Sequence, residues 1–398
     1  MPTIRFFVLF FALVSAVSCS DSKKKEDVKS KKAQQQKAKL ARLNKVSALP
    51  ETFKSPANNP MSEEKTALGK LLFFDPILSG DKDVSCATCH HPSTGYAEFL
   101  DISIGPNATG LGSKRKFNSP NDIPFVKRNA PTVLNTAYNN IDTRERYNPE
   151  TAAMFWDNRV QSLEKQALEP IKAFEEMRGK NYTEDEILNV VVERLKKIPE
   201  YKKLFAEVFG ENAITIENMG KAIAAFERSL VSNNSRFDKY MRGDEDAIHL
   251  SEKEGFALFR SVGCINCHNG PMFSDYKPHV IGVPDNDKLK EIDRGIKDTF
   301  AFRTPTLRNL RFTAPYMHNG SLVSLKRVLE FYEDIANGKE RNKNVSKDMF
   351  DPLVDELELT VKEMSLIISF LNTLNDEDFD KQPPESVPSG LPVGGNIE

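Results

Sequence analysis

Two short motifs, Cys86-Ala-Thr-Cys89-His90 and Cys264-Ile-Asn-Cys267-His268, constrain this 398-residue chain more than any other feature. Two thiols separated by two residues can add to both vinyl groups of one haem, and the adjacent histidine then lies beneath the iron as its ligand. A zinc site is the alternative for Cys-x-x-Cys, but it does not explain why histidine follows directly in both copies. The sequence therefore predicts two covalently bound haem c groups, with His90 and His268 as iron ligands.

The fifth cysteine, Cys19, follows Arg5, the apolar stretch 6–17 and a run of small residues. This pattern predicts a secretory signal over residues 1–19, and its terminal cysteine predicts lipoprotein processing, with a plain cleaved signal as the alternative. The other four cysteines all belong to the two motifs, which leaves none for a structural disulfide. We therefore expect a periplasmic protein that contacts the membrane through a lipid anchor only.

The charge is unevenly distributed. Residues 23–45 carry ten basic and two acidic side chains, and we expect residues 20–49 to form a solvated, Lys-rich tether. Nucleic-acid binding is the alternative for a lysine run, and export argues against it. Beyond residue 45 the chain has 44 basic and 54 acidic residues, a net charge near −10. This charge favours a basic electron donor.

Apolar residues at helical spacing predict several helices. They cover about 65–74, 162–177, 184–198, 217–233, 325–335 and 361–373, and Ser251 with Glu254 is expected to form a capping box that opens another before Cys264. Strand patterns are sparse, and residues 101–127 favour a long surface loop. We expect a mainly α chain with two cytochrome c-like lobes, each carrying one haem: 50–235, then 236–385, followed by a flexible tail over 386–398.

Four stretches give a family resemblance. They are Leu72-Phe73-Phe74-Asp75-Pro76-x-Leu78-Ser79-Gly80, Arg128-Asn129-Ala130-Pro131-Thr132, Phe155-Trp156-Asp157-x-Arg159 and Thr313-Ala314-Pro315-Tyr316-Met317-His318-Asn319-Gly320. In this order they resemble bacterial dihaem cytochrome c peroxidases over most of residues 60–375. That family includes true peroxidases and relatives similar to MauG, which oxidises side chains of another protein.

The resemblance implies roles at the N-terminal haem. Trp156 matches an electron relay between the haem groups, although a packed core residue is the reading from composition alone. Gln166 and Glu176 match a distal pair that assists peroxide cleavage, although solvated polar residues are the ordinary reading. On one straight helix these two would not share a face, but Pro170 interrupts the helix and allows them to converge. His318 matches a position that bonds a haem propionate, and His279 is a further candidate for this role.

The resemblance also implies a ligand at the second haem. Tyr332 aligns with the family's distal methionine, and its spacing from Leu325 and Leu329 directs it inward on a helix. A core tyrosine is the alternative role for Tyr332, and Met317 is the alternative ligand. At the first haem, Pro106 stands where many relatives have a ligating histidine, so we expect that iron to be open without reductive activation.

A calcium site is implied between the lobes. Asn129 and the carbonyls of Thr313 and Pro315 match it, and oxygen ligands suit Ca²⁺. The expected function is reduction of hydrogen peroxide at the N-terminal haem, with electrons from a small cytochrome c or cupredoxin. The alternatives are a MauG-like oxidase of a partner protein and a pure electron-transfer cytochrome; an acid–base pair over an open iron argues against the last.

Overall fold

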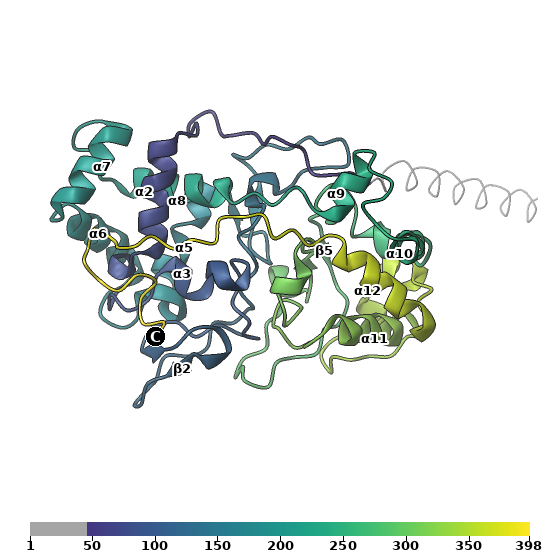
Figure 1. The fold of residues 1–398 in the computed structure, drawn as a ribbon. Helices are drawn as coiled ribbons and strands as arrows, with labels where there is room; N and C mark the ends of the chain where they lie inside the picture. Colours follow the sequence, from purple (N-terminus) through teal and green to yellow (C-terminus); the bar gives the residue numbers. More distant parts are fainter. Residues whose placement is uncertain (1–45) are drawn as a thin grey trace, which may run out of the picture. The chain divides into compact units, whose positions relative to one another are not determined.

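The computed structural model describes residues 46–398, so the predicted signal and most of the predicted tether lie outside the described part of the chain. Within 46–398, no helix combines the length and the apolar character needed to cross a bilayer. The regular structure is almost entirely helical (Figure 1). It confirms the expectation of a mainly α protein.

The helices divide into two groups along the chain. The first group comprises α2 (Glu63–Phe74), α3 (Cys86–Cys89), α4 (Leu163–Gln166), α5 (Glu169–Lys172), α6 (Glu184–Leu195), α7 (Pro199–Phe209) and α8 (Ile216–Ser229). The second group comprises α9 (Arg236–Met241), α10 (Leu250–Ser261), α11 (Leu325–Ala336) and α12 (Met364–Asn372).

Short elements complete the structure. The 3-10 turns are η1 (Pro76–Leu78), η2 (Pro92–Thr94), η3 (Gly112–Lys114), η4 (Thr136–Tyr138), η6 (Cys264–Asn266), η7 (Ile296–Asp298), η8 (Leu310–Phe312), η9 (Lys347–Met349), η10 (Pro352–Glu356) and η11 (Val361–Glu363), and η5 (Phe174–Arg178) is a π-helical turn. Three antiparallel pairs of two-residue strands join β1 (Ala108–Thr109) to β2 (Lys116–Phe117), β3 (Ala153–Met154) to β4 (Val160–Gln161), and β5 (Pro278–His279) to β6 (Phe302–Arg303).

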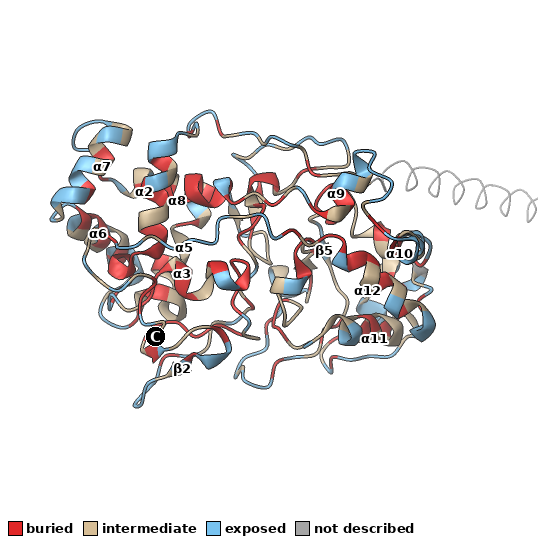
Figure 2. Cartoon of the chain, viewed as in Figure 1, coloured by how far each residue is buried: buried red, intermediate tan, exposed pale blue. Residues whose placement is uncertain are grey.

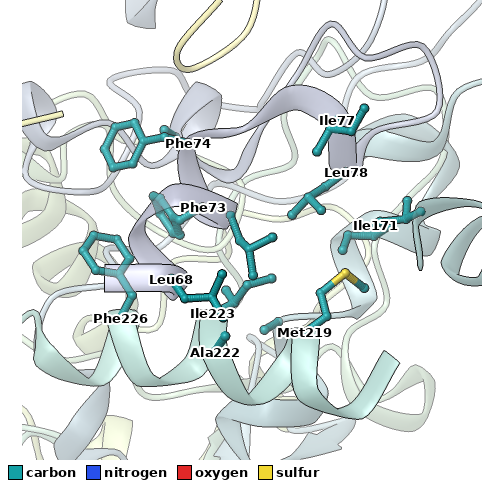
Figure 3. Close-up of a cluster of buried hydrophobic side chains, with 14 of the residues drawn as sticks. Leu68, Phe73, Phe74, Ile77, Leu78, Ile171, Met219, Ala222, Ile223 and Phe226 are labelled. Carbon is teal, nitrogen blue, oxygen red and sulfur yellow. The ribbon is translucent and has the colours of Figure 1, made fainter. Parts of the chain in front are cut away.

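Buried apolar side chains form two main clusters. The N-terminal core takes its residues from 68–230, with Val387 added from the end of the chain, and Figure 3 shows part of it between α2 and α8. The C-terminal core takes its residues from 237–374. Buried residues dominate α8, whereas α7 has many exposed ones (Figure 2). Each core packs against the first cysteine of one haem motif, Cys86 or Cys264.

The two cores are built on the same helix crossing. In α2, a Cβ at Gly69 would lie 1.9 Å from the Ala222 carbonyl oxygen of α8. In α10, a Cβ at Gly255 would lie 2.0 Å from the Leu366 carbonyl oxygen of α12. Only glycine allows backbones to approach this closely. A repeated phenylalanine pair supports the equivalence.

That pair lies one turn beyond each glycine. Phe73 packs against Phe226 with ring centroids 5.2 Å apart, and Phe259 packs against Phe370 at the same 5.2 Å. In each half the first phenylalanine follows its glycine by four residues, and the second follows the contacted carbonyl residue by four. The second half therefore repeats the local packing of the first.

The helical pattern over 162–177, with its expected interruption at Pro170, appears as α4, α5 and η5. Pro170 lies in the first turn of α5, where its missing N–H costs no hydrogen bond. The capping box expected at Ser251 is wrong: α10 begins earlier, and His249 is its N-cap, with the His249 N–H donating to Glu252 (2.7 Å). The segment expected to be helical over 361–373 begins with a capping box in which the Thr360 N–H donates to Glu363 (2.9 Å).

The expected flexible tail over 386–398 is wrong. The Gly394 N–H donates to Phe74 O (2.8 Å), the Asn396 N–H donates to Asp83 O (2.8 Å), and Val387 belongs to the N-terminal core. The tether boundary at residue 49 is also wrong, because Leu49 is buried and its N–H donates to Asp238 Oδ1 (2.9 Å). Neither segment shows apolar residues at helical spacing in the sequence. Hydrogen bonds of the backbone hold both segments in place, and such bonds leave no sequence pattern.

Candidate functional site

The first haem motif forms the short helix α3 and the turn after it. Thr88 accepts a hydrogen bond from the Ser85 N–H (2.9 Å) and donates to Gly394 O (2.7 Å), which fixes the motif from both sides. The His90 Nδ1–H lies 3.0 Å from Tyr96 O. This hydrogen bond orients the ring and leaves Nε2 with its lone pair free for a metal. Burial lowers the pKa of His90, which favours the neutral imidazole that binds iron.

The second motif has the same arrangement on a different local structure. Cys264 begins the turn η6, and the His268 Nδ1–H lies 2.9 Å from Phe273 O. Burial lowers the pKa of His268 as well. All four motif cysteines are free thiols rather than disulfides. Both motifs thus present two sulfurs and one free imidazole nitrogen, the donor set that c-type haem requires.

One continuous cavity of about 600 Å³ joins the two motifs. Cys86 and His90 line one part of it, Cys264 and His268 line another, and Trp156 also lines it. The walls combine apolar side chains with a small number of polar ones, as is usual for cofactor sites. The residues present therefore fit two haem groups, one at each motif.

Gln166 and Glu176 line this cavity together with His90. Gln166 ends α4 and Glu176 lies in η5, so the interruption around Pro170 brings to one cavity two residues that a straight helix would separate. Within residues 46–398 the Glu176 carboxylate has neither a hydrogen-bond nor an ion-pair partner. Burial, and then the charge of Glu175, raise the pKa of Glu176 to about 7. A carboxyl with this pKa can both accept and donate a proton at neutral pH.

Trp156 is fixed by a hydrogen bond to the residue expected at the calcium site. Its indole Nε1–H donates to Asn129 O (3.0 Å), and the Asn129 N–H donates to His318 O (2.8 Å). The indole also makes an edge contact with the His318 ring at 6.5 Å. Trp156, Asn129 and His318 therefore form one connected group beside the cavity.

His318 and His279 have different surroundings. His318 stacks on Phe302 with 3.6 Å between ring centroids, and burial lowers its pKa to about 3. A neutral imidazole that lines the cavity can still donate one hydrogen bond to a haem propionate. His279 instead has both ring nitrogens within hydrogen-bonding distance of aspartates, Asp351 (2.7 Å) and Asp275 (3.1 Å). No donor on His279 is left for a propionate, which argues against the role suggested for it from sequence.

Tyr332 lies in the part of the cavity next to the second motif. Burial, and then the charges of Cys267 and Cys264, raise the pKa of Tyr332, and both Tyr332 and Cys264 pack against the C-terminal core. Two fully buried tyrosines donate their hydroxyls to acceptors in the chain, Tyr138 to Pro50 O (2.8 Å) and Tyr201 to Asp75 Oδ2 (2.7 Å). The Tyr332 hydroxyl has no such partner in the described chain. Met317 also lines the cavity and packs in the same apolar cluster as Tyr332.

The expected calcium ligands share the cavity wall. Asn129, Thr313 and Pro315 all line it. The Asn129 side-chain amide donates to Leu100 O (2.7 Å) and Asp101 O (3.2 Å), which leaves its Oδ1 as an acceptor for another group. Residues 46–398 contain no cluster of three His, Cys, Asp or Glu side chains suited to a metal. A calcium ion here would therefore depend on carbonyl and amide oxygens.

Sequence reasoning missed several acidic residues of the cavity, and the most deeply buried of them is Glu227 on α8, which is 5% exposed. It lies in an ordinary amphipathic helix, and no motif marks it. Comparison of Phe226-Glu227 with Phe370-Leu371 across the two halves would have identified it, because the same position is apolar in the second half.

The chain is similar in sequence to a known family and to several known proteins. The profile of the family described as di-haem cytochrome c peroxidase matches residues 63–246. The methylamine utilization protein MauG of Methylorubrum extorquens is 38% identical over 85% of this chain and 86% of its own length. Cytochrome c551 peroxidase of Nitrosomonas europaea is 34% identical, with 84% and 86% coverage.

Solved structures share this fold. A MauG-like protein associated with microbial copper homeostasis is 28% identical with a TM-score of 0.66, covering 83% of this chain and 95% of that one. The diheme peroxidase BthA from Burkholderia thailandensis, at 23% identity and a TM-score of 0.61, shares the fold over 87% of this chain and 98% of its own. The chain therefore belongs to the dihaem cytochrome c peroxidase and MauG family, and it is a peroxidase-type oxidoreductase with two c-type haem groups.

Proposed function

We propose that this protein reduces hydrogen peroxide at the haem held by Cys86, Cys89 and His90. Electrons come from a small, basic cytochrome c or cupredoxin and pass through the second haem and Trp156. In this proposal the chain forms two cytochrome c-like lobes, one around each core. The observation that carries it is the unpartnered Glu176 carboxyl in the cavity of the first motif. A pure electron carrier needs no such group.

The roles of the side chains follow from their chemistry. Haem at this motif would supply an iron that binds peroxide and transfers electrons to it. Glu176 accepts the proton of one peroxide oxygen and returns it to the other oxygen as that oxygen leaves as water. The Gln166 amide orients peroxide by hydrogen bonds. A positioned acid–base group of this kind contributes about 10²–10⁴-fold to a rate.

Two contacts of Trp156 support a relay role. Its hydrogen bond to Asn129 O and its edge contact with His318 hold the indole in one orientation in the cavity that joins the motifs. A fixed aromatic ring requires little rearrangement when it gains or loses an electron. We assign it to electron transfer between the two haem groups.

A second function, oxidation of a partner protein as in MauG, is favoured by Tyr332. Its hydroxyl lacks a partner within residues 46–398, and Tyr332 lines the same cavity as Cys264 and Cys267, where a tyrosinate could ligate the second iron. A hard anionic ligand lowers a haem potential, so the second iron would share oxidising equivalents rather than store electrons. The MauG relative at 38% identity is consistent with this alternative.

We also propose a calcium ion at Asn129, Thr313 and Pro315, and a periplasmic location with a lipid anchor at Cys19. The free Asn129 Oδ1 supports the ion, because Ca²⁺ prefers oxygen ligands. Through Asn129 the ion would hold Trp156 in place. Incubation with a strong chelator should then lower peroxide turnover, and full activity in calcium-free protein would contradict the site.

The test of the main proposal is an assay of the fully oxidised protein, without prior reduction, using peroxide and a reduced cytochrome c. We expect immediate turnover, because Pro106 offers no ligand to the first iron. Its neighbour Gly105 lies against the backbone of Glu175 and Glu176, so the proline is next to the proposed acid–base residue. Activity only after half-reduction, or a spectrum with both irons six-coordinate and low-spin, would contradict the proposal.

A further inference from the structure

The cavity at the first motif contains a second buried carboxyl, Glu227. Its side chain is 5% exposed, and its Oε2 has no hydrogen-bond partner within residues 46–398. Glu227 and the first attachment cysteine, Cys86, both line this cavity, and the charge of Glu227 is second only to burial in raising the pKa of the Cys86 thiol. A buried polar atom without a partner is rare in native proteins and indicates a ligand, a water or a functional role.

The neighbouring cations are all bound elsewhere. Arg228, the next residue on α8, pairs with Glu164 of α4 (2.8 Å) and also donates to Ala224 O. Lys65 of α2 donates to Asn59 Oδ1 (3.0 Å) and Pro60 O. The η4 turn contributes only a hydrogen bond to the Glu227 backbone carbonyl. No cation therefore neutralises Glu227 directly.

The protonation of Glu227 follows from these surroundings. Burial raises its pKa to about 8; the positive charge of Arg228 opposes this shift, and Glu164 adds to it. Cys86 of α3 becomes an uncharged thioether once haem is attached, and Glu176 of η5 is the remaining titratable carboxyl near that sulfur. Glu227 is therefore suited to hold a proton at neutral pH and to lose it when positive charge appears nearby.

The duplicated packing shows that this carboxyl is not needed for the fold. Phe226 and Phe370 are equivalent in the two helix crossings, so Glu227 is equivalent to Leu371. Both residues line the cavity, one near each motif. In the C-terminal half a leucine fills the position. The N-terminal half has a buried acid there, at the cost of desolvating it.

The reaction requires such a group. Reduction of peroxide combines H₂O₂, two electrons and two protons to give two molecules of water. Glu176 supplies one proton-holding group. Asp157 and Asp293, which also line the cavity, are both ion-paired with Arg128, and their pKa values are lowered by that arginine against the effect of burial. They stay ionised and do not store protons near neutral pH.

We propose that Glu227 is the second proton-holding group of the N-terminal haem cavity. When the haem there gains an electron, the Glu227 carboxylate takes up a proton from solvent. When peroxide is reduced and its O–O bond breaks, that proton passes to an oxygen that leaves as water. The proposal extends the peroxidase function proposed above, and the delivery step rests on it.

The test is a spectroscopic redox titration of the full-length haem-loaded protein at several pH values. In the wild type, the midpoint potential of the N-terminal haem should decrease as pH rises, because proton uptake accompanies reduction. Glu227→Gln, which keeps the shape, and Glu227→Leu, which copies Leu371, should both show a smaller decrease. The residual slope comes from other buried carboxyls near the first motif, Glu176 and Glu98, since burial raises the pKa of each to about 7. Glu217→Gln, an exposed change on the same helix, should match the wild type.

A second measurement begins with wild-type protein alone. The infrared difference spectrum of wild-type protein, reduced minus oxidised, should show a protonated carboxyl band that shifts in D₂O. Glu227→Gln should lack that band. An unchanged pH dependence and an unchanged band in Glu227→Gln would overturn the proposal, as would the absence of any carboxyl band in the wild type. If the band and slope behave as expected but wild-type protein does not turn over peroxide, the proton site stands and the peroxidase function fails.

Discussion

The N-terminal and C-terminal cores share a scaffold but differ in the side chains that face the cavity. Both have a glycine-mediated helix crossing, a phenylalanine pair at 5.2 Å and a motif histidine bonded to a backbone carbonyl. The first motif is accompanied by Gln166, Glu176 and Glu227, whereas the second has Tyr332 and Leu371. The packing that holds a haem is thus separable from the residues that decide its chemistry.

Glu176→Gln, a change in the N-terminal half alone, should have the largest effect on peroxide turnover. We expect both haem groups to stay attached and peroxide turnover to fall by about 100-fold or more, because an amide cannot accept the peroxide proton. Steady-state assays with a reduced cytochrome c measure the loss, and the absorption spectrum checks haem content. Near-wild-type rates in this variant would remove Glu176 from the mechanism.

Gly69→Ala and Gly255→Ala test whether the two crossings are equivalent. Each added methyl would meet a carbonyl oxygen at about 2 Å, at 1.9 Å and 2.0 Å respectively, so we expect each to lower the free energy of unfolding by about 2–3 kcal/mol. Denaturant unfolding, with haem absorbance as a probe of each half, measures this. Ser365→Ala, an exposed change on α12, should stay within about 0.5 kcal/mol. A large effect at only one glycine would show that the crossings are not equivalent.

The pH dependence of peroxide turnover should show a smaller effect, which comes from the acidic residue of the N-terminal half. Burial and the charge of Glu175 raise the pKa of Glu176 to about 7, and the ionised form is the proton acceptor. The value of kcat/KM for peroxide should therefore fall roughly tenfold per pH unit below that pKa and level off above it. Glu176→Gln should abolish this slope. A profile that decreases with rising pH through 7 would contradict the role of Glu176 as base.

Tyr332 substitutions should change the second haem only. Tyr332→Met should raise its midpoint potential and make it an electron reservoir, because a neutral thioether stabilises oxidised iron less than a phenolate does. Tyr332→Phe should leave an open or water-ligated iron. A redox titration of the three proteins measures both effects. Methionine ligation in the wild type, with Tyr332→Phe unchanged, would make Met317 the ligand.

The sequence predicted the elements that depend on local patterns. The haem motifs and the helices around 65–74, 184–198, 217–233 and 325–335 appear where apolar spacing places them. The expected break at Pro170 also appears, and it brings Gln166 and Glu176 to one cavity. These features depend on neighbouring residues or on covalent constraints of proline and cysteine, which a single sequence displays.

Features that depend on distant backbone contacts could not be predicted. Leu49 is fixed by Asp238, and Gly394 by Phe74, through single hydrogen bonds that no periodicity marks. His249 rather than Ser251 caps α10. Either residue can precede a helix, and tertiary packing determines where the helix begins. The site residue Glu227 was missed for a related reason. Its equivalence to Leu371 becomes clear only from the packing of the two cores.

The return of residues 387–396 to the N-terminal core has a consequence for biogenesis. The Gly394 carbonyl accepts the Thr88 hydroxyl from within the first haem motif, and those residues are 306 positions apart in the chain. Residues 387–396 are synthesised long after the first motif, so the motif lacks this hydrogen bond until they are available. A late part of the chain therefore completes the packing of a cofactor site whose binding residues come early in the sequence.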